Sequence, residues 1–171
     1  MLLRHAKSDW SVSGQKDHDR TLASRGQMAA PLMGHYMASH ALVPDHAIVS
    51  TSARTRETWQ LAAEAFPKKP PTSYESQIYE AEPDEILAAI ADAPPEAKSL
   101  LVVGHNPGFQ ETAALLIGTG DAKARAKIAA KFPTAALAVI DFDVKAWTDV
   151  RPGKGRLERF ITPRAIGDNG D

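Results

Sequence analysis

Three short apolar runs, each ending abruptly in a polar cluster, constrain most strongly what this chain can fold into. Runs of this kind, bounded by turn-forming residues, are typical of strands that are buried on both faces of a sheet. The stretches between them have the lengths and apolar spacing of helices. The three runs are residues 2–3 before Arg4 and His5, residues 47–49 before Ser50, and residues 100–103 before Gly104 and His105.

Strands that alternate with helices in this way form a largely parallel sheet covered by helices on both faces. The sequence therefore predicts a three-layer α/β/α fold with a mostly parallel central sheet. A chain of 171 residues can bury one core, so we expect a single domain over residues 1–171 with a polar tail at about 167–171. We expect helices at residues 28–40, 54–66, 84–91, 109–117 and 121–130, a further strand at 135–142, and a short edge strand at 156–161.

The composition excludes several classes of function. The chain has no cysteine, which rules out disulfide scaffolds, thiolate metal sites and cysteine nucleophiles. A net charge of −1 creates no field that would gather nucleic acid or an anionic membrane. No stretch approaches the ~20 apolar residues of a membrane span, and the N-terminus lacks the pattern of a signal peptide. We therefore expect a cytoplasmic protein that binds neither nucleic acid nor membranes.

The first apolar run is unusually short for a central strand. Only residues 1–3 precede Arg4, whereas a strand usually has about five residues. This shortness suggests that the chain begins at an abbreviated start site.

Four charged or titratable residues follow the three predicted strands. Ligands of open α/β sheets bind beyond the carboxyl ends of the strands, so Arg4, His5 and His105 are expected to meet there, together with Arg54. Arginine offers a planar fork of donors that matches phosphate oxygens. Arg54 also opens its predicted helix, where backbone N–H groups favour an anion. Two arginines and two histidines predict a phosphoryl pocket rather than an acid–base site built from carboxylates.

Five segments of the sequence, in their order and spacing, resemble the histidine phosphatase superfamily, and within it the SixA-like phosphohistidine phosphatases. The resemblance implies a phosphoglycerate mutase-like α/β fold. It covers most of the chain. The segments are residues 3–8 (LRHAKS, similar to the RHG signature of the family), residues 17–22 with Arg25 and Gly26, residues 50–58, residues 104–108 (GHNPG) and residues 160–163 (FITP).

The resemblance implies a role for each member of the cluster. His5 would be the nucleophile, Arg4 and Arg54 would clamp the phosphoryl group, and His105 would be the second histidine facing it. A histidine attacks phosphorus only when neutral, and flanking guanidinium charges oppose its protonation, so the expected pocket suits that role. No metal or other cofactor is expected.

Further residues are implied at the edge of the site. The resemblance places Arg20 at the rim, where it could bind phosphate or the rest of the substrate, and Asn106 among the substrate-binding residues. Phosphomutase-like relatives use a glutamate as proton donor, for which Glu80 and Glu82 are the candidates and Glu80 is preferred. SixA-like members do not obviously share that acid.

The sequence thus predicts a metal-independent phosphatase that works through a phosphohistidine enzyme intermediate. The favoured substrate is phosphohistidine on a protein partner. Two alternatives remain open: a phosphatase of small phosphate esters, and a catalytically idle module that binds phosphoproteins. The expected partner is accordingly a phosphorylated protein or a small phosphate compound.

Overall fold

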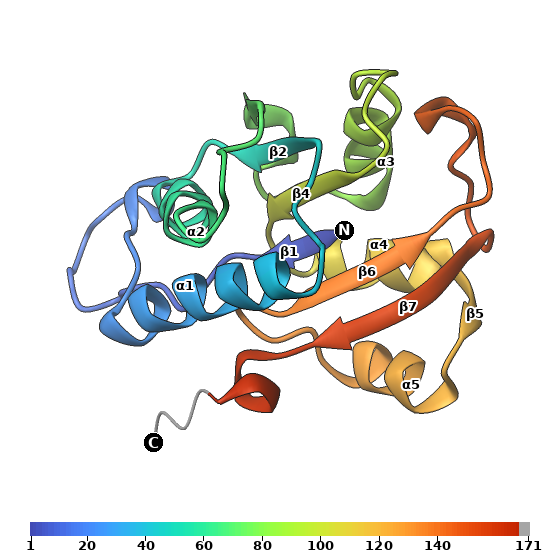
Figure 1. Cartoon of the computed structure of the whole chain (residues 1–171). Coiled ribbons are helices and arrows are strands. Elements are labelled where there is room, and N and C mark those ends of the chain that lie inside the picture. The colour runs from blue at the N-terminus through green and yellow to red at the C-terminus, as the bar shows by residue number, and fades with distance from the viewer. Residues whose placement is uncertain (168–171) are drawn as a thin grey trace.

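A seven-stranded sheet with the strand order β3-β2-β4-β1-β6-β7-β5 forms the centre of the protein (Figure 1). The computed structural model describes residues 1–167, so most of the predicted polar tail, residues 168–171, lies outside the described residues. Strands β1, β4, β2 and β3 are parallel to one another, whereas β6 runs antiparallel to β1 and β7. The strands are β1 (Leu2–Arg4), β2 (His46–Ser50), β3 (Thr72–Glu75), β4 (Leu100–Gly104), β5 (Ile117–Gly120), β6 (Leu137–Asp141) and β7 (Gly155–Ile161).

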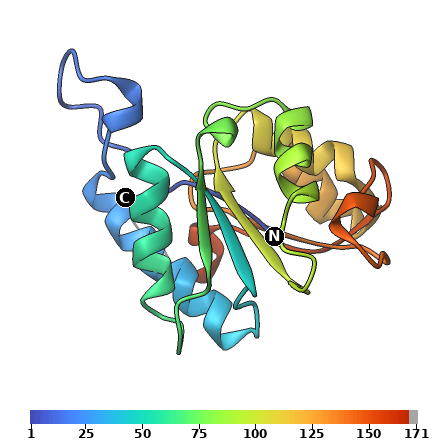
Figure 2. The same cartoon turned by 90° about the horizontal axis from the view of Figure 1, so that it is seen from above.

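Helices cover both faces of the sheet, which confirms the predicted three-layer α/β/α fold. Helices α1 and α2 lie on one face, and α3, α4 and α5 lie on the other (Figure 2). The helices are α1 (Ser24–Ser39), α2 (Ala53–Ala63), α3 (Pro83–Ala91), α4 (Gly108–Leu116) and α5 (Ala122–Ala130), with 3₁₀ helices η1 (Asp17–Asp19), η2 (Ser76–Ile78), η3 (Trp147–Asp149) and η4 (Pro163–Ile166).

The alternation of side chains along the strands divides the apolar core between these two faces. Leu2 of β1 packs in the cluster beneath α3, α4 and α5, and its neighbour Leu3 packs in the cluster beneath α1 and α2. Val102 and Val103 of β4 alternate in the same way. Because both faces are apolar, these strands are continuous hydrophobic runs, which is why they could be recognised in the sequence.

A side-chain cap fixes the start of α2. Ser52 is the N-cap residue, and its hydroxyl accepts a hydrogen bond from the backbone N–H of Thr55. Such a cap satisfies one of the N–H groups that the first turn of a helix leaves unpaired. The cap places Arg54 in the first turn of α2, directly after β2.

Two edge regions differ from the prediction. Residues 156–161 were expected as an edge strand, but β7 lies between β6 and β5, and β5 is the edge. Strand β5 was missed because it follows α4 without a break and contains Gly118 and Gly120, which have little strand propensity. Gly118 allows a close approach, since a Cβ atom there would lie 1.9 Å from the carbonyl oxygen of Gly153. At the other edge, β3 was missed because it has no buried residue and therefore no apolar run.

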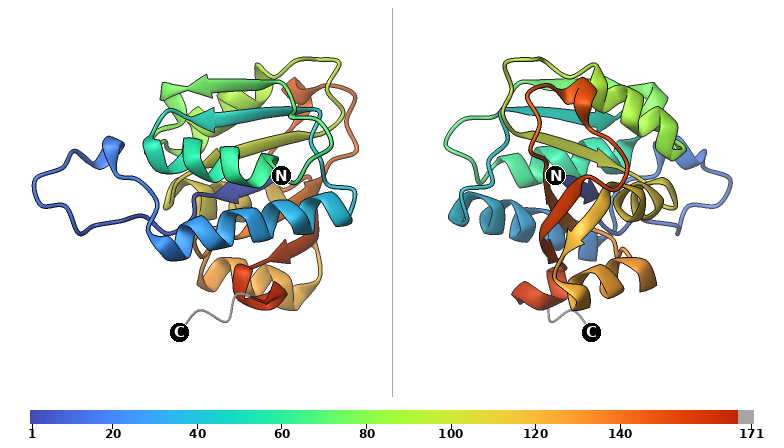
Figure 3. Two further views of the ribbon diagram at one scale, coloured as in Figure 1. Left: turned by 60° about the vertical axis from the view of Figure 1, so that its left-hand side comes forward. Right: turned by 90° about the vertical axis from the view of Figure 1, so that its right-hand side faces the viewer.

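The connection between β1 and α1 forms a long loop. It leaves the carboxyl end of β1, contains η1, and projects away from the sheet, as the views in Figures 2 and 3 both show. A bridge between Ser8 and Leu22 closes its base. Helix α1 then begins at Ser24, four residues before the predicted start, and contains Pro31 in its interior. Although the loop projects, its segment η1 contacts α2 near the edge at which β1 ends.

We expect Gly34→Ala to destabilise the protein, because α1 and α2 touch at this glycine. A Cβ atom at position 34 would lie 2.1 Å from the carbonyl oxygen of Ala62 in α2. Alanine favours a helix interior over glycine by roughly 0.5–1 kcal/mol, but overpacking of a rigid contact costs about 1–3 kcal/mol, so the clash dominates. Urea denaturation measures the change. His35→Ala, an exposed substitution one residue away on α1, is the control; equal stabilities of the two variants would contradict the prediction.

Candidate active site

The carboxyl ends of β1, β2 and β4 lie at the same edge of the sheet (Figure 1). The predicted histidines and arginines lie at or just after these strand ends. The backbone N–H of His5 donates to the carbonyl oxygen of Gly104 at 3.0 Å, which extends the pairing of β1 with β4 beyond the strand. The rings of His5 and His105 consequently lie 5.3 Å apart between centroids. Arg54 reaches them from α2, with its Nη2 3.3 Å from Nδ1 of His105. All three side chains are buried.

The hydrogen bonding of His5 determines which of its nitrogens can react. Nδ1 lies 2.7 Å from the carbonyl oxygen of Ala6. A carbonyl only accepts, so Nδ1 carries the proton and Nε2 keeps its lone pair. The pKa of His5 is lowered to about 4, chiefly by burial and also by the guanidinium groups of Arg54 and Arg4, while the bond to Ala6 opposes them in part. His5 is therefore neutral at neutral pH, with Nε2 as its basic atom.

His105 is held from both sides of its ring. Nδ1 accepts from the Arg54 guanidinium, so the proton is on Nε2, which donates to the hydroxyl oxygen of Ser50 at 2.7 Å. The pKa of His105 is lowered to about 3, chiefly by burial and also by His5 and Arg54. Two uncharged imidazoles thus lie beside permanent positive charge.

Arg4 and Asn106 are both fixed by the same backbone carbonyl. Nη1 of Arg4 and Nδ2 of Asn106 donate to the carbonyl oxygen of Phe132, at 2.9 and 3.0 Å. Phe132 belongs to the connection between α5 and β6, which forms a wall of the site. The Nε of Arg4 is buried and has no hydrogen-bond partner among residues 1–167. A buried donor without a partner is rare, and an anion bound here could accept from it.

The guanidinium of Arg54 is bound by a residue for which the sequence predicted no role. Its Nη1 donates to the backbone carbonyl of Asp17 at 2.7 Å, and its Nη2 donates to Oδ2 of Asp17 at 2.9 Å. The hydroxyl of Tyr79 donates to the same Oδ2. Asp17 lies in one of the family-like segments, so it could have been noticed in the sequence. No sequence signal pointed to Tyr79.

A threonine connects β1 to α2 behind the histidines. The hydroxyl oxygen of Thr58 accepts from the backbone N–H of Ala6 at 2.9 Å and donates to the carbonyl oxygen of Arg54 at 2.7 Å. It is fully buried. This contact fixes Ala6, which follows His5, against the first turns of α2, and so helps to set the distance from His5 to Arg54.

The structure places Arg20 within the projecting loop. Its guanidinium carbon lies 4.1 Å from the centroid of the Trp10 ring, and its Nη2 donates to the carbonyl oxygen of Gln15 at 3.2 Å. These contacts organise the loop, and a contact of Arg20 with substrate stays a prediction.

The two candidate proton donors lie near the start of α3. Glu80 is exposed, has a φ of 51°, and interacts electrostatically with Asp17 and Tyr79. Glu82 is the N-cap residue of α3. Of the two, only Glu80 has contacts that link it to the histidine cluster, and its role as an acid stays a prediction.

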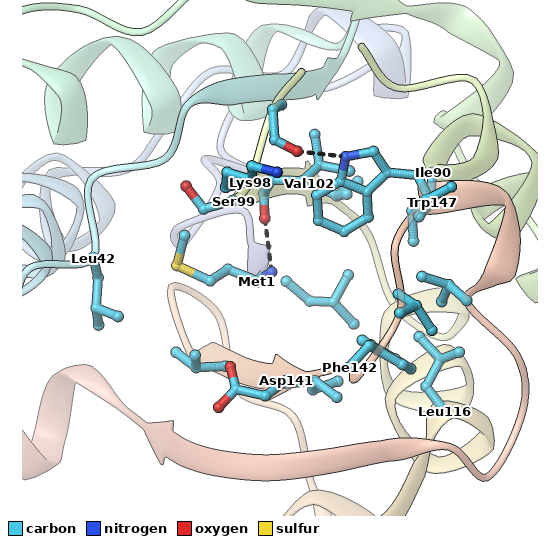
Figure 4. Close-up of a pocket in the computed structure, with 18 of the residues that line it drawn as sticks. Met1, Leu42, Ile90, Lys98, Ser99, Val102, Leu116, Asp141, Phe142 and Trp147 are labelled. Atoms are coloured by element: carbon cyan, nitrogen blue, oxygen red, sulfur yellow. Dashed lines mark hydrogen bonds between the residues drawn. The ribbon is translucent and has the colours of Figure 1, made fainter. Parts of the chain in front are cut away.

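A cavity of about 620 Å³ lies at the opposite end of the sheet (Figure 4). It opens between β4 and β6 beyond Met1, whose amino group donates to the carbonyl oxygen of Leu100 at 2.8 Å. Its lining is mostly apolar and includes neither His5 nor His105. This cavity is therefore separate from the candidate active site, which is defined by its histidines and arginines at the other end of the sheet.

Within residues 1–167, no three histidine, aspartate or glutamate side chains are grouped so that they could hold a metal ion. None of the helices in this range is both long and apolar enough to span a membrane.

Comparison with known proteins agrees with the geometry of the site. The family model described as the histidine phosphatase superfamily (branch 1) matches residues 1–85. An uncharacterized protein of Mycobacterium tuberculosis is 36% identical over 164 residues, which cover 95% of this chain and all of that protein.

Solved structures show the same relationship. A crystal structure from Agrobacterium tumefaciens, assigned to the phosphohistidine phosphatase SixA, is 33% identical with a TM-score of 0.80, covering 95% of this chain and 96% of that one. A structure of the protein histidine phosphatase SixA complexed with tungstate has a TM-score of 0.77 at 17% identity, covers 97% of both chains, and shares the fold. With the two histidines and two arginines gathered at one edge of this fold, the chain belongs to the histidine phosphatase superfamily.

Proposed function

We propose that the protein is a metal-independent phosphatase that removes the phosphoryl group from phosphohistidine on a protein partner, through a phosphohistidine intermediate at His5. The observation that carries this proposal is a buried, neutral His5 with an unprotonated Nε2 beside two arginines and a second imidazole. The similarity to the Agrobacterium tumefaciens SixA structure supports phosphohistidine as the substrate.

In the first step the lone pair of His5 Nε2 attacks phosphorus, and the P–N bond of the substrate breaks. The electrons of that bond go to the departing imidazole nitrogen, and the substrate ring leaves neutral because it has been protonated on its other nitrogen. Charge on the phosphoryl oxygens is then stabilised by Arg4 and Arg54. In such transfers, positioning and electrostatic stabilisation provide most of the catalysis.

In the second step water attacks phosphorus on His5. The bond between Nε2 and phosphorus breaks, His5 recovers its lone pair, and inorganic phosphate leaves with the oxygen of the water. The hydrogen bond from His5 Nδ1 to the carbonyl of Ala6 holds the ring in one orientation throughout both steps.

The contacts of the imidazoles favour a phosphoramidate over an ester. Within the described residues, neither His5 nor His105 has a hydrogen bond to a carboxyl group that could protonate a leaving alkoxide. An imidazole needs no such help, since it can be protonated before it leaves.

One observation favours hydrolysis of small phosphate esters as a second candidate function. Glu80 is exposed near Asp17, and its φ of 51° is a strained conformation for a residue with a side chain. Such strain is often found at functional sites. Glu80 would then supply the proton that an alkoxide leaving group requires.

His5→Ala should abolish turnover while the protein remains folded, because the chain has no cysteine that could replace the nucleophile. The wild-type protein, quenched in alkaline detergent after reaction with ³²P-labelled substrate, should carry label that is stable to alkali and lost in acid. The labelled protein is measured after gel separation. His35→Ala is the control and should label normally. Near-normal turnover by His5→Ala would end the proposal of a covalent intermediate.

Both site histidines should remain neutral in moderately acidic solution. Burial holds the pKa of His5 at about 4 and that of His105 at about 3, so the rings gain a proton only as the pH falls through those values. Titration of the ring resonances by NMR, with His5→Asn and His105→Asn to identify the signals, measures this directly. A midpoint at or above the ordinary value of about 6.5 for either ring would contradict the described electrostatics.

The protein should have a higher kcat/KM for a phosphohistidine-bearing protein than for phosphoserine or sugar phosphates. General acid catalysis is typically worth ~10²–10⁴-fold, and its absence slows esters selectively. Parallel assays of the three substrate types measure the preference, and Glu80→Gln should affect ester hydrolysis more than phosphohistidine hydrolysis. If an ester is the best substrate and Glu80→Gln abolishes its hydrolysis, the second candidate function replaces the first.

A further inference from the structure

We propose that Asp17 and Tyr79 are positioning residues that lock the guanidinium of Arg54 in the orientation in which it binds the phosphoryl group. The inference rests on the proposed function for the identity of the bound group, and it extends that function to two residues outside the histidine and arginine cluster. Neither residue is assigned a reacting role.

Asp17 binds two nitrogens of one guanidinium with two different oxygens. Its backbone carbonyl accepts from Nη1 and its carboxylate accepts from Nη2 of Arg54, at 2.7 and 2.9 Å. Two parallel bonds to one planar fork fix its rotation as well as its position. The side chain of Arg54 is 7% exposed and that of Asp17 is 34% exposed, so the pair lies at the boundary between the pocket and solvent.

Tyr79 fixes the carboxylate in turn. Its hydroxyl donates to the same Oδ2 that accepts from Arg54. Its ring meets His105 edge-on at 5.2 Å between centroids and lies 5.9 Å from the guanidinium carbon of Arg54. Tyr79, which lies in the connection between β3 and α3, thereby contacts Asp17, Arg54 and His105.

The projecting loop that carries Asp17 is attached to the body of the protein next to this carboxylate. Nε2 of His18 lies 2.9 Å from the hydroxyl of Thr51, just before α2, and the His18 ring packs edge-on against Tyr79 at 4.9 Å. These contacts hold η1 against the start of α2. Without them, Asp17 would move with a loop that otherwise stands in solvent (Figure 3).

At neutral pH the Tyr79 hydroxyl remains protonated and the Asp17 carboxyl remains ionised, as their hydrogen bond requires. Burial raises the pKa of Asp17, but the hydrogen bond from Tyr79 and the contacts of Arg54 outweigh it, so the pKa is lowered overall. Burial and Asp17 raise the pKa of Tyr79 to about 12. Tyr79 therefore stays a donor and Asp17 stays an anion.

Holding Arg54 matters because an arginine side chain has many rotamers and loses conformational entropy when it is ordered. If Asp17 fixes the side chain before substrate arrives, phosphoryl binding does not have to order it. Preorganised donors are the ones that stabilise developing charge effectively. Asp17 and Tyr79 act on the phosphoryl group only through Arg54, and this distinguishes a positioning role from a direct one.

The test is a double-mutant cycle on the binding of tungstate, a phosphate-shaped anion, and on turnover. Asp17→Ala should weaken tungstate binding ~10- to 100-fold, the range typical of groups that orient a ligand-binding side chain. Asp17→Asn keeps an oxygen acceptor and should lose less. Tyr79→Phe removes one hydrogen bond and should cost about 2- to 10-fold. In an Arg54→Ala background, each of these changes should have less than about a 2-fold effect, since Arg54 transmits them.

Two controls isolate the positioning role. Asp19→Ala removes the same charge from the same loop, at a side chain that is 64% exposed and lies 3.7 Å from the His18 ring. Tyr74→Phe removes a hydroxyl from an exposed tyrosine that lies against Arg56. Both should bind tungstate as the wild type does. Thermal melts check folding, and if Asp17→Ala is unfolded, Asp17→Asn and Tyr79→Phe decide the question.

Equal losses of tungstate affinity in the wild-type and Arg54→Ala backgrounds would overturn the inference. It would also be overturned if Tyr79→Phe and Asp17→Asn both bound tungstate as the wild type does, or if the wild type did not bind tungstate. The outcome is separable from the proposed function. Coupling in tungstate binding without any phosphorylated His5 would refute the proposed function and keep the inference. A phosphorylated His5 with no coupling would do the reverse.

Discussion

The parallel pairing of β1 with β4 is the constraint on which the rest of the site depends. Arg4 is in register with Gly104, and the bond from the N–H of His5 to the carbonyl of Gly104 continues the ladder by one residue. His5 and His105 are therefore equivalent positions on neighbouring strands, and the distance between them follows from the spacing of the sheet. Arg54 joins them because β2 pairs with the other side of β4 and ends at the same edge.

The electrostatic character of the site follows from this convergence. Burial keeps both imidazoles uncharged, while the guanidinium groups of the arginines supply the positive charge. This distribution favours an anion beside an imidazole that keeps its lone pair, which is the combination that the proposed phosphoryl transfer requires. Asp17, which is more exposed than Arg54, balances part of its charge.

The sequence was informative where a signal was local and silent where the structure depends on contacts between distant segments. Strands β1, β2 and β4 were predictable because apolar runs end in polar residues, and that pattern alone gathered His5, Arg54 and His105. Edge strands β3 and β5 have no buried run, so their residues carried no comparable signal. The contact of Tyr79 with Asp17 joins residues 62 positions apart and arises only when η1 packs against α2, which no periodicity reveals.

The carbonyl of Phe132 connects the interior of the protein to the site. Arg4 and Asn106 both donate hydrogen bonds to it. The phenyl ring of Phe132 is completely buried and packs edge-on against Phe160. The alignment of Arg4 and Asn106 therefore depends on an aromatic contact in the core. A substitution that shifts this contact would move both side chains, so the geometry of the site can diverge between relatives even where its own histidines and arginines are the same.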